Sequence, residues 1–404
     1  MPETGEVDLM SANSNPRAKS GVFFLVPVYL VVFSAFFDTH AQMPVLAPYA
    51  VTLGATPFIL GIVVGSYSLF NILGNFFSGM TIDRKSWKLP LFLGLAGVSL
   101  ILVLYTRADN ALHLVMIRAG HGFMGGLLVP AALACLTGQQ GGSAFHGSRL
   151  ALFGATIGMA AVTGPLVAGI VATRFGFDTV YYSLAVIMFV AAIGALGFLG
   201  RQPVCSLHND QPPISYSQIF IRPKMLSAFL FAFGTMGSVG ALATFLPTRS
   251  GMLGFNHAQT GMLFTTFAFT AIVMQVLWPG RLKPIYKEDC RGCYFGIVLL
   301  CMTLVFAASA NSSAGLFIAL GLFGIGFGLS FQGMLGMVID DSRPGWRGRA
   351  IGFFFAVYSL GVAVVPPLSG LIWQHLPSIF PFYSAAVAAL VSLIAGGLYL
   401  RKRD

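Results

Sequence analysis

Long apolar blocks alternate with short polar segments along almost the whole chain. A helix of about 20 apolar residues is long enough to cross a lipid bilayer. The blocks predict an all-α membrane protein with twelve transmembrane helices, near residues 21–49, 57–81, 89–107, 111–136, 149–172, 178–200, 225–248, 258–280, 292–310, 314–338, 350–373 and 379–400.

The polar segments divide the chain into four parts. Residues 1–20 form a polar, partly acidic tail that lacks the basic region of a cleaved signal peptide. Two six-helix bundles are predicted over 21–200 and 225–404, and the segment 201–224 is predicted to link them. We expect the tail and the linker to be cytoplasmic. The linker is too short to hold a catalytic domain.

The composition excludes most soluble proteins. Of the 404 residues, 56% are hydrophobic and 9% are charged, and the mean hydropathy is +0.82. A soluble domain has about 25% charged residues, which it needs to cover its surface. The low charge therefore argues against a soluble enzyme, and the apolar content argues against a disordered chain.

The basic residues indicate membrane topology rather than nucleic-acid binding. The net charge is +10, but the Lys and Arg residues stand in short runs between apolar blocks, not in one basic surface. Nineteen of the 23 lie in the termini and loops of one side, whereas the opposite loops contain three, Arg107, Arg174 and Arg249. Because positive charge is retained inside the cell, both termini are predicted to be cytoplasmic.

An internal repeat relates the two halves. Leu46, Leu53, Gly54 and Gly61 recur 200 residues later as Leu246, Leu253, Gly254 and Gly261. Gly122-Phe123 is similar to Gly326-Phe327, and Pro165-Leu166 with Gly169 is similar to Pro367-Leu368 with Gly370. Repeated halves are typical of secondary transporters, which bind substrate between them near the middle of the membrane.

Four motifs stand in the amino-terminal half. The first helix ends Asp38-Thr-His-Ala-Gln-Met-Pro44-Val-Leu-Ala-Pro48, and the loop after the second reads Gly79-Met-Thr-Ile-Asp83-Arg84-Lys-Ser86-Trp-Lys88. The fourth helix contains Arg118-Ala-Gly-His-Gly122-Phe-Met-Gly-Gly126, and the fifth contains Gly154, Gly158, Gly164-Pro165 and Gly169. Together they resemble the major facilitator superfamily, and in particular its 12-helix drug:proton antiporters. Ser86 departs from the glycine that is usual in the family's loop motif, and the counterpart loop in the second half, Gly280-Arg-Leu-Lys-Pro, lacks the acid.

The resemblance implies a latch between the halves on the cytoplasmic side, formed by Gly79, Asp83 and Arg84. The family's acid near the fourth helix is missing here, and Asp340 or Asp341 is a substitute partner for Arg84. The resemblance also implies that Gly164 and Pro165 limit leakage. The residues alone equally allow simpler roles. The loop with Asp83 and Arg84 could be a solvated segment that sets membrane topology, the glycines could serve helix packing, and Pro165 could only kink its helix.

Asp38 and Arg118 are the two charged residues predicted well within helices. A charge at the bilayer centre costs roughly 2.5–3.5 kcal/mol on insertion scales, so such residues usually face a cavity or a partner. We predict that Asp38 takes up the coupling proton and that Arg118 modulates it. The alternative is that Asp38 ends a helix at a watery outer mouth.

Other polar residues within the predicted helices are secondary candidates. His121 shares a helix face with Arg118 and could relay protons, whereas His40 points to a different face from Asp38. Gln42 shares the face of Asp38. Candidates for binding substrate, or for bonding a neighbouring helix, are Gln42, Asn71, Asn75 and Gln332.

The second half contributes aromatic and Met side chains rather than buried charge. Leu322 stands where the repeat would place a counterpart of Arg118, and the candidate walls are Phe231, Phe233, Met236, Phe267, Phe269, Trp278, Phe353, Phe354 and Tyr358. Such walls adapt to varied apolar ligands, so we expect an amphipathic, apolar or cationic small-molecule substrate.

The predicted activity is proton-coupled export by a monomer in the plasma (bacterial inner) membrane, with protons, lipid and substrate as its partners. A proton-coupled importer or uniporter of a nutrient remains the alternative. No enzyme motif occurs, and a lone Cys290-x-x-Cys293 does not make a metal or redox site, so we expect no enzyme activity, cofactor or metal.

Overall fold

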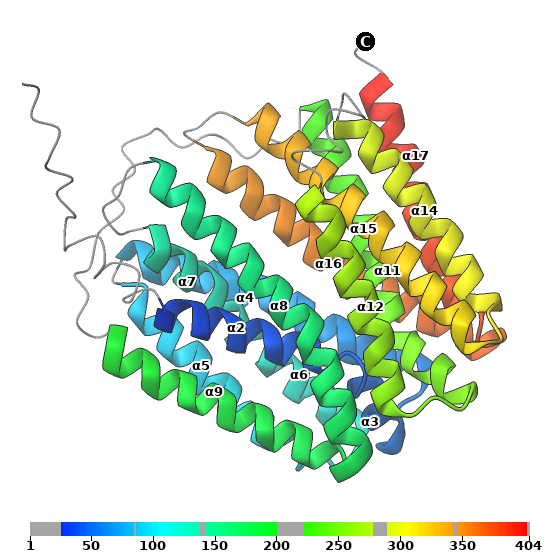
Figure 1. Cartoon of the computed structure of the whole chain (residues 1–404), viewed down its shortest axis with the longest axis horizontal. Helices are drawn as coiled ribbons and strands as arrows, with labels where there is room; N and C mark the ends of the chain where they lie inside the picture. Colours follow the sequence, from blue (N-terminus) through cyan, green and yellow to red (C-terminus); the bar gives the residue numbers. More distant parts are fainter. Residues whose placement is uncertain are drawn as a thin grey trace, which may run out of the picture.

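A computed structural model describes residues 26–84, 86–137, 143–199, 222–277, 289–342 and 346–401, and every regular element in these ranges is a helix (Figure 1). The amino-terminal half contains α2 (Val26–Ala41), α3 (Leu46–Thr52), α4 (Pro57–Arg84), α5 (Lys88–Tyr105), α6 (Ala111–Gly126), α7 (Leu128–Thr137), α8 (Ser143–Phe175) and α9 (Phe177–Leu199). The carboxyl-terminal half contains α11 (Pro223–Met252), α12 (His257–Leu277), α14 (Asp289–Ser309), α15 (Ser313–Asp341), α16 (Arg347–His375) and α17 (Phe380–Arg401).

The twelve predicted spans are confirmed. Within the described residues, eleven helices are long and apolar enough to cross a membrane, and the bent pair of α2 and α3 is the twelfth candidate. The fourth span combines α6 and α7. The tail 1–20 and almost all of the linker 201–224 lie outside the described residues.

The first span is broken rather than continuous. The axes of α2 and α3 differ by 49°, and residues 42–45 form the turn between them. Pro44 has no backbone N–H to donate to the preceding turn, and its ring excludes a regular helix there. The helix resumes when the Leu46 amide donates to the Gln42 carbonyl at 2.9 Å. The prediction of one straight helix over 21–49 missed this break.

The repeated glycines end two equivalent helices in the same way. Gly54 and Gly254 have φ of 80° and 81°, a left-handed conformation that glycine adopts without steric cost. In both turns the next residue, Ala55 or Phe255, donates its amide to a carbonyl five residues back, at 3.0 Å. This is the glycine cap that satisfies the last carbonyls of a helix. The repeat seen in the sequence is therefore also a repeat of backbone geometry.

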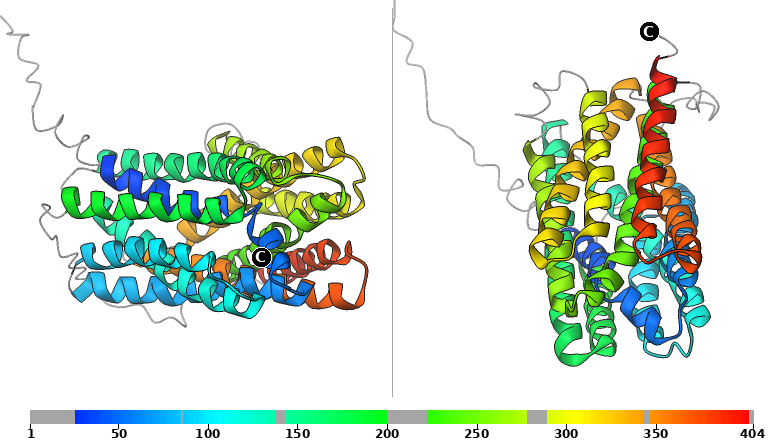
Figure 2. Two further views of the ribbon diagram at one scale, coloured as in Figure 1. Left: turned by 90° about the horizontal axis from the view of Figure 1, so that it is seen from below. Right: turned by 90° about the vertical axis from the view of Figure 1, so that its right-hand side faces the viewer.

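The two halves meet along two helix pairs, α4 with α16 and α8 with α12. Figure 1 shows α8 beside α12, and Figure 2 gives two further views of the bundle. We call the end where α2 begins and α17 ends the terminal end, and the end where α3 leads to α4 the distal end. Both pairs run along the molecule between these ends.

Glycines bring the halves into backbone contact at the distal end. A Cβ on Gly61 would lie 2.5 Å from the Pro366 carbonyl oxygen, and one on Gly261 would lie 2.3 Å from that of Pro165. Equivalent contacts join Gly370 to Pro57 and Gly169 to His257, at 2.2 and 2.4 Å. Small residues allow this close approach in lipid, where packing rather than hydrophobicity holds helices together.

The terminal end is more open along these helices. A Cβ on Gly79 of α4, on Gly154 of α8, or on Gly348 or Gly352 of α16 would meet no heavy atom within 4 Å. The described helices of the two halves are therefore in closest contact at the distal end.

Candidate functional site

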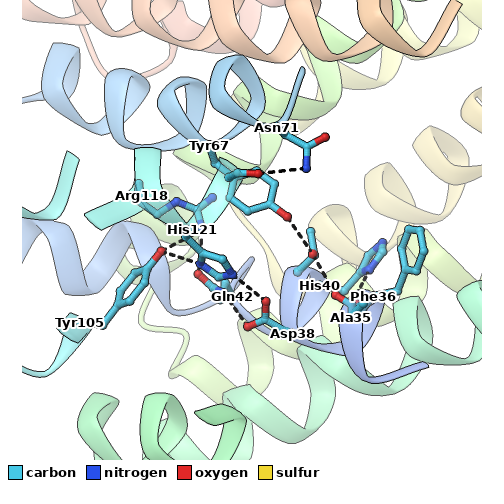
Figure 3. Close-up of polar contacts among 12 residues, drawn as sticks. Ala35, Phe36, Asp38, His40, Gln42, Tyr67, Asn71, Tyr105, Arg118 and His121 are labelled. Atoms are coloured by element: carbon cyan, nitrogen blue, oxygen red, sulfur yellow. Dashed lines mark hydrogen bonds and ion pairs between the residues drawn. The ribbon is translucent and has the colours of Figure 1, made fainter. Parts of the chain in front are cut away.

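Asp38 lies in the last turn of α2, directly before the break in the first span, and is 2% exposed. Its Oδ1 accepts a hydrogen bond from the Gln42 amide nitrogen at 2.8 Å, and its Oδ2 lies 2.8 Å from Nε2 of His121 (Figure 3). Gln42 is also 2% exposed and His121 is fully buried. The carboxylate is therefore held out of water but has a partner on each oxygen.

Arg118 completes the site from α6. Its NH1 donates to the Gln42 side-chain oxygen at 2.8 Å and to the Tyr105 hydroxyl at 3.2 Å. The Tyr105 hydroxyl lies 3.0 Å from Nδ1 of His121. Five side chains thus form a closed hydrogen-bonded ring, which runs from Asp38 through Gln42, Arg118, Tyr105 and His121 back to Asp38. We call it the Asp38 ring.

Helical spacing places these side chains. Asp38 and Gln42 are four residues apart, and Arg118 and His121 are three apart, so each pair shares a helix face. Tyr105 is the last residue of α5. Gly122 lets α6 approach α4, because a Cβ there would lie 2.1 Å from the Tyr67 carbonyl oxygen. The motif that starts at Arg118 thus combines two ring members, Arg118 and His121, with a close helix contact.

Tyr67 covers one side of the Asp38 ring. The Arg118 guanidinium lies 4.5 Å from the centre of the Tyr67 ring, and the His121 ring packs edge-on against it at 5.2 Å. The Tyr67 hydroxyl lies 3.3 Å from that of Thr39, and a Cβ on Gly125 would come within 2.8 Å of it. A cation over an aromatic face is stabilised by the ring quadrupole. Tyr67 is half-buried.

The charged pair of the site makes no direct ion pair. Gln42 alone bridges Asp38 and Arg118 on one side, and Tyr105 with His121 bridges them on the other. The Arg118 Nε also donates to the Val63 carbonyl at 3.3 Å. Removing one member of a buried charge pair typically costs about 3–5 kcal/mol, because the other charge is left uncompensated. Asp38 and Arg118 are therefore linked through intervening side chains rather than by a direct contact.

The remaining amino-terminal candidates are turned away from Asp38. His40 points to another face, as expected, and its Nδ1 lies 2.7 Å from the Phe36 carbonyl. Asn75 donates to the Asn71 side chain at 2.8 Å, and Asn71 donates to the Gly122 carbonyl at 3.4 Å. Both asparagines lie on the same face of α4 as Tyr67. Their hydrogen bonds link the two asparagines to each other and link α4 to α6.

Four of the carboxyl-terminal candidates are buried or partly buried within their half of the molecule. Phe231 is fully buried and packs on Tyr294 of α14, 5.7 Å between ring centres, and against Gly396 of α17. Tyr358 is partly buried among aromatic residues, with Phe331 at 6.2 Å. Met236 is 6% exposed and Gln332 is partly buried.

The predicted latch falls largely outside the described side chains. The side chains of Asp83 and Arg84 lie outside them, and Gly79 has open space around its Cα. Asp341, suggested as a partner of Arg84, is instead bound by Arg222 at 3.1 Å. The Arg222 guanidinium also lies 5.3 Å from the Trp346 ring centre.

Gly164 and Pro165 stand where α8 meets two other helices. A Cβ on Gly164 would lie 3.0 Å from the Ala41 amide of α2, and the Pro165 carbonyl faces Gly261 across the boundary between the halves. The helix α8 continues through Pro165 to Phe175. These residues connect the turn that carries Asp38 to the contact between α8 and α12.

No group of three His, Cys, Asp or Glu side chains that could hold a metal ion occurs in the described part of the chain. Cys293 of the CxxC pair is buried, with its Sγ 3.7 Å from the Ser330 carbonyl. Its thiol is thus part of the packing between α14 and α15.

Two contributors to the site were missed from the sequence. Tyr67 precedes Asn71 and Asn75 by steps of four, so helical spacing could have placed it on the same face. Tyr105 ends an apolar helix and has no spacing relation to Asp38 or Arg118. Its place in the Asp38 ring depends on how α5 packs against α6, which the sequence pattern does not specify.

The chain matches the family model of the Major Facilitator Superfamily over residues 28–279 and 228–404. "Multidrug efflux protein YfmO" of Bacillus subtilis (strain 168) is 23% identical over 386 residues, covering 94% of this chain and 92% of that protein. "Inner membrane transport protein YajR" of Escherichia coli (strain K12) is 24% identical, covering 87% and 77%. "Multidrug resistance protein MdtG" of Rahnella sp. (strain Y9602) is 30% identical over 48% of this chain and 47% of its own.

Solved structures have the same fold. The nucleoside transporter NupG superposes with a TM-score of 0.74 at 14% identity, covering 94% of this chain and 98% of that one. A bacterial homologue of the human lysosomal transporter Spinster, in an inward-facing and unoccupied conformation, gives 0.75 at 14% identity, with 96% and 97% covered. With the family model matched along most of its length, the chain belongs to the major facilitator superfamily and is an integral membrane transporter, not an enzyme.

Proposed function

We propose that this transporter exports small amphipathic, apolar or cationic molecules in exchange for protons, and that Asp38 is the proton-coupling acid. Arg118 and His121 adjust the affinity of Asp38 for the proton. The observation that carries the proposal is a buried carboxylate with a histidine on one oxygen and an amide on the other, linked on both sides to a buried guanidinium. A group that titrates in such a place changes the net charge of the membrane interior by one.

Proton uptake at Asp38 would remove the negative end of the charge pair. The Coulomb attraction between Asp38 and Arg118 is strong in a medium of low polarity, and it disappears when the carboxylate is neutralised. Asp38 lies in the last turn of α2, and Gly164 of α8 packs against that turn, with its Cβ position 3.0 Å from the Ala41 amide nitrogen. We infer that the change in charge is transmitted through this turn to the contact between α8 and α12.

The contacts between the halves suit one state of an alternating-access cycle. Closest approach at the distal end and open space around the terminal-end glycines fit a state that is closed at the distal end. We assign the terminal end to the cytoplasm, following the basic residues, and the membrane to a bacterial inner membrane. In this state the transporter would face the cytoplasm. We further propose that it functions as a monomer.

The substrate is proposed to lie between the halves. Asn71 and Asn75 of α4 would contribute from one side, and Met236, Gln332 and Tyr358 from the other. Phe231 packs within the carboxyl-terminal half, so we now assign it to packing. The efflux and multidrug names of YfmO and MdtG support an export function and an apolar or amphipathic substrate.

Reconstituted protein tests the proposal directly. Proteoliposomes with an imposed pH gradient are supplied with ethidium, an amphipathic cation, or with uridine, a polar neutral solute. We expect ethidium to move against the proton gradient, and Asp38→Asn to abolish this uphill transport while downhill exchange of ethidium continues.

A matched control is Asp109→Asn, since the Asp109 side chain is 85% exposed, outside the spans. It should transport like the unchanged protein. Uphill ethidium transport by Asp38→Asn would reject the coupling role of Asp38. Uptake of uridine along with protons would support the importer alternative.

A further inference from the structure

The Asp38 ring has one consistent direction of hydrogen bonding when Asp38 is ionised and His121 is neutral. A guanidinium can only donate, so both contacts of Arg118 NH1 run outward, to the Gln42 oxygen at 2.8 Å and to the Tyr105 oxygen at 3.2 Å. The Tyr105 hydroxyl oxygen has two lone pairs, so the direction of its 3.0 Å contact with His121 Nδ1 is set by the tautomer of the histidine.

The direction continues through the histidine. An ionised Asp38 can only accept, so its 2.8 Å contact through Oδ2 then requires a proton on Nε2 of His121, and Nδ1 of a neutral His121 accepts from Tyr105. Two arms therefore run from guanidinium to carboxylate. The short arm is Gln42, and the long arm is Tyr105 followed by His121. In this state Asp38 is ionised and each ring contact joins a donor to an acceptor.

One added proton can enter only the long arm. The short arm cannot reverse, because a turned Gln42 amide would place its NH₂ group against Arg118, which cannot accept. The proton therefore resides on Asp38 Oδ2, with His121 changed to its other tautomer, or on His121 itself. In both cases Nδ1 of His121 becomes a donor toward Tyr105, and the Tyr105 hydroxyl proton loses its acceptor.

Tyr181 offers a second acceptor beside the long arm. Its hydroxyl is buried and has no hydrogen-bond partner among the described residues. Its ring stacks on that of Tyr105, with centres 4.5 Å apart and planes 21° apart. A buried hydroxyl without a partner costs free energy, which a new hydrogen bond would recover.

We propose that Tyr105 is a positioning residue that switches acceptors with the protonation state of the ring. Its hydroxyl donates to His121 when the ring is deprotonated and to Tyr181 when one proton has been added. The switch connects the proton on α2 and α6 to the packing of α5 against α9. This inference rests on the proposed function insofar as Asp38 or His121 takes up a proton.

Other titratable groups surround the ring in both states. They are Tyr67 from α4 and Tyr49 from α3, whose hydroxyl donates to the Tyr105 backbone carbonyl. The helices α7, α8 and α9 also pack on α2, and α9 carries Asp178 in its first turn. Cys135 is the titratable residue of α7, and Arg149 and Arg174 lie near the two ends of α8.

Two substitutions should move the protonation midpoint of the ring in opposite directions. Tyr105→Phe removes the donor that keeps His121 directed toward an ionised Asp38, so the proton should bind more readily and the midpoint should rise by about one pH unit. Tyr181→Phe removes the acceptor needed after proton uptake, so the midpoint should fall by about half a unit. In the double variant Tyr181 has nothing to accept, and the midpoint should equal that of Tyr105→Phe.

Infrared titration of the purified protein in lipid measures the midpoint without any transport substrate. The carboxylic-acid band that Asp38→Asn removes reports Asp38, and imidazole bands that His121→Gln removes report His121. Tyr182→Phe is the matched control, since Tyr182 is the exposed neighbour on α9 and its hydroxyl contacts Thr106 instead. Its midpoint should match that of the unchanged protein.

An unchanged or raised midpoint in Tyr181→Phe overturns the switch, and this variant removes a hydroxyl that has no partner to lose. A lowered midpoint in Tyr105→Phe, or additive shifts in the double variant, also overturns it. If neither Asp38 nor His121 changes protonation at any pH, the switch and the proposed function both fail. If the shifts occur as expected but Asp38→Asn still drives uphill ethidium transport, only the proposed function fails.

Discussion

Gly370 permits a backbone contact between the halves, and Gly370→Ala should weaken closure of the distal end. A Cβ at this position would lie 2.2 Å from the Pro57 carbonyl oxygen, 2.7 Å from its carbonyl carbon and 3.0 Å from the Phe58 Cα. All three atoms belong to the backbone at the start of α4. None can rotate aside as the end of a flexible side chain would, so the two helices must separate.

The required separation sets the magnitude. Nonbonded carbon atoms prefer separations of about 3.5–4.0 Å, so α4 and α16 must move apart by about 1 Å. Overpacking of a well-packed contact typically costs about 1–3 kcal/mol. A loss of about 2 kcal/mol from the distally closed state changes its ratio to the open state by about 30-fold.

Gly352→Ala is the matched control. Gly352 lies in the same helix, α16, and a Cβ there meets no heavy atom within 4 Å. Both variants gain the same intrinsic helix propensity of about 1 kcal/mol, so that contribution cancels in the comparison. The difference between them isolates the contact with α4.

Distances between spin labels measure the two states. Leu112 at the start of α6 and Leu376 directly after α16 are exposed at the distal end, 64% and 45%, and belong to different halves. On a cysteine-free background, Gly370→Ala should shift the label pair toward longer distances, and Gly352→Ala should not. Identical distance distributions in the two variants would refute the assignment of this contact to distal closure.

Three further outcomes follow from the same geometry. Gly54→Ala and Gly254→Ala should each lower the free energy of unfolding by about 1–2 kcal/mol, because φ is 80° and 81° at these positions. Thermal denaturation should show equal losses in both variants and no such loss in the control Gly251→Ala. Gln42→Ala should cost about 1–3 kcal/mol, because Asp38 Oδ1 loses its donor and Arg118 NH1 keeps only Tyr105, and a melting temperature equal to that of the unchanged protein would count against the ring. Arg118→Lys should reduce uphill ethidium transport at least about tenfold, because an ammonium cannot reproduce the guanidinium fork, and full activity in the proteoliposome assay would be inconsistent with that role.

The fold could be predicted from the sequence because lipid imposes strong rules on composition. Apolar blocks fixed the number of spans, and the repeated Gly54 and Gly254 indicated two related halves, which the backbone turns confirm. The break in the first span was missed, although Pro44 and Pro48 stand close together in it. Apolar composition alone does not distinguish a straight span from a bent one.

The site could be predicted only in part. Asp38 and Arg118 stand out because charge is rare within membrane helices, and Gln42 and His121 follow from helical spacing. The direct contact between Asp38 and His121, in place of one with Arg118, depends on how α6 lies relative to α2, which helical spacing within one helix does not specify. The contributions of Tyr67 and Tyr105 likewise come from neighbouring helices that the sequence does not orient.

The most direct test of the central claim is proton release on substrate binding. Purified protein in weakly buffered detergent is mixed with ethidium, and the pH of the solution is followed with an indicator dye. If Asp38 holds the coupling proton, ethidium should release protons in proportion to the amount bound, and Asp38→Asn should bind ethidium without releasing any. Equal proton release from Asp38→Asn and from the unchanged protein would contradict the account.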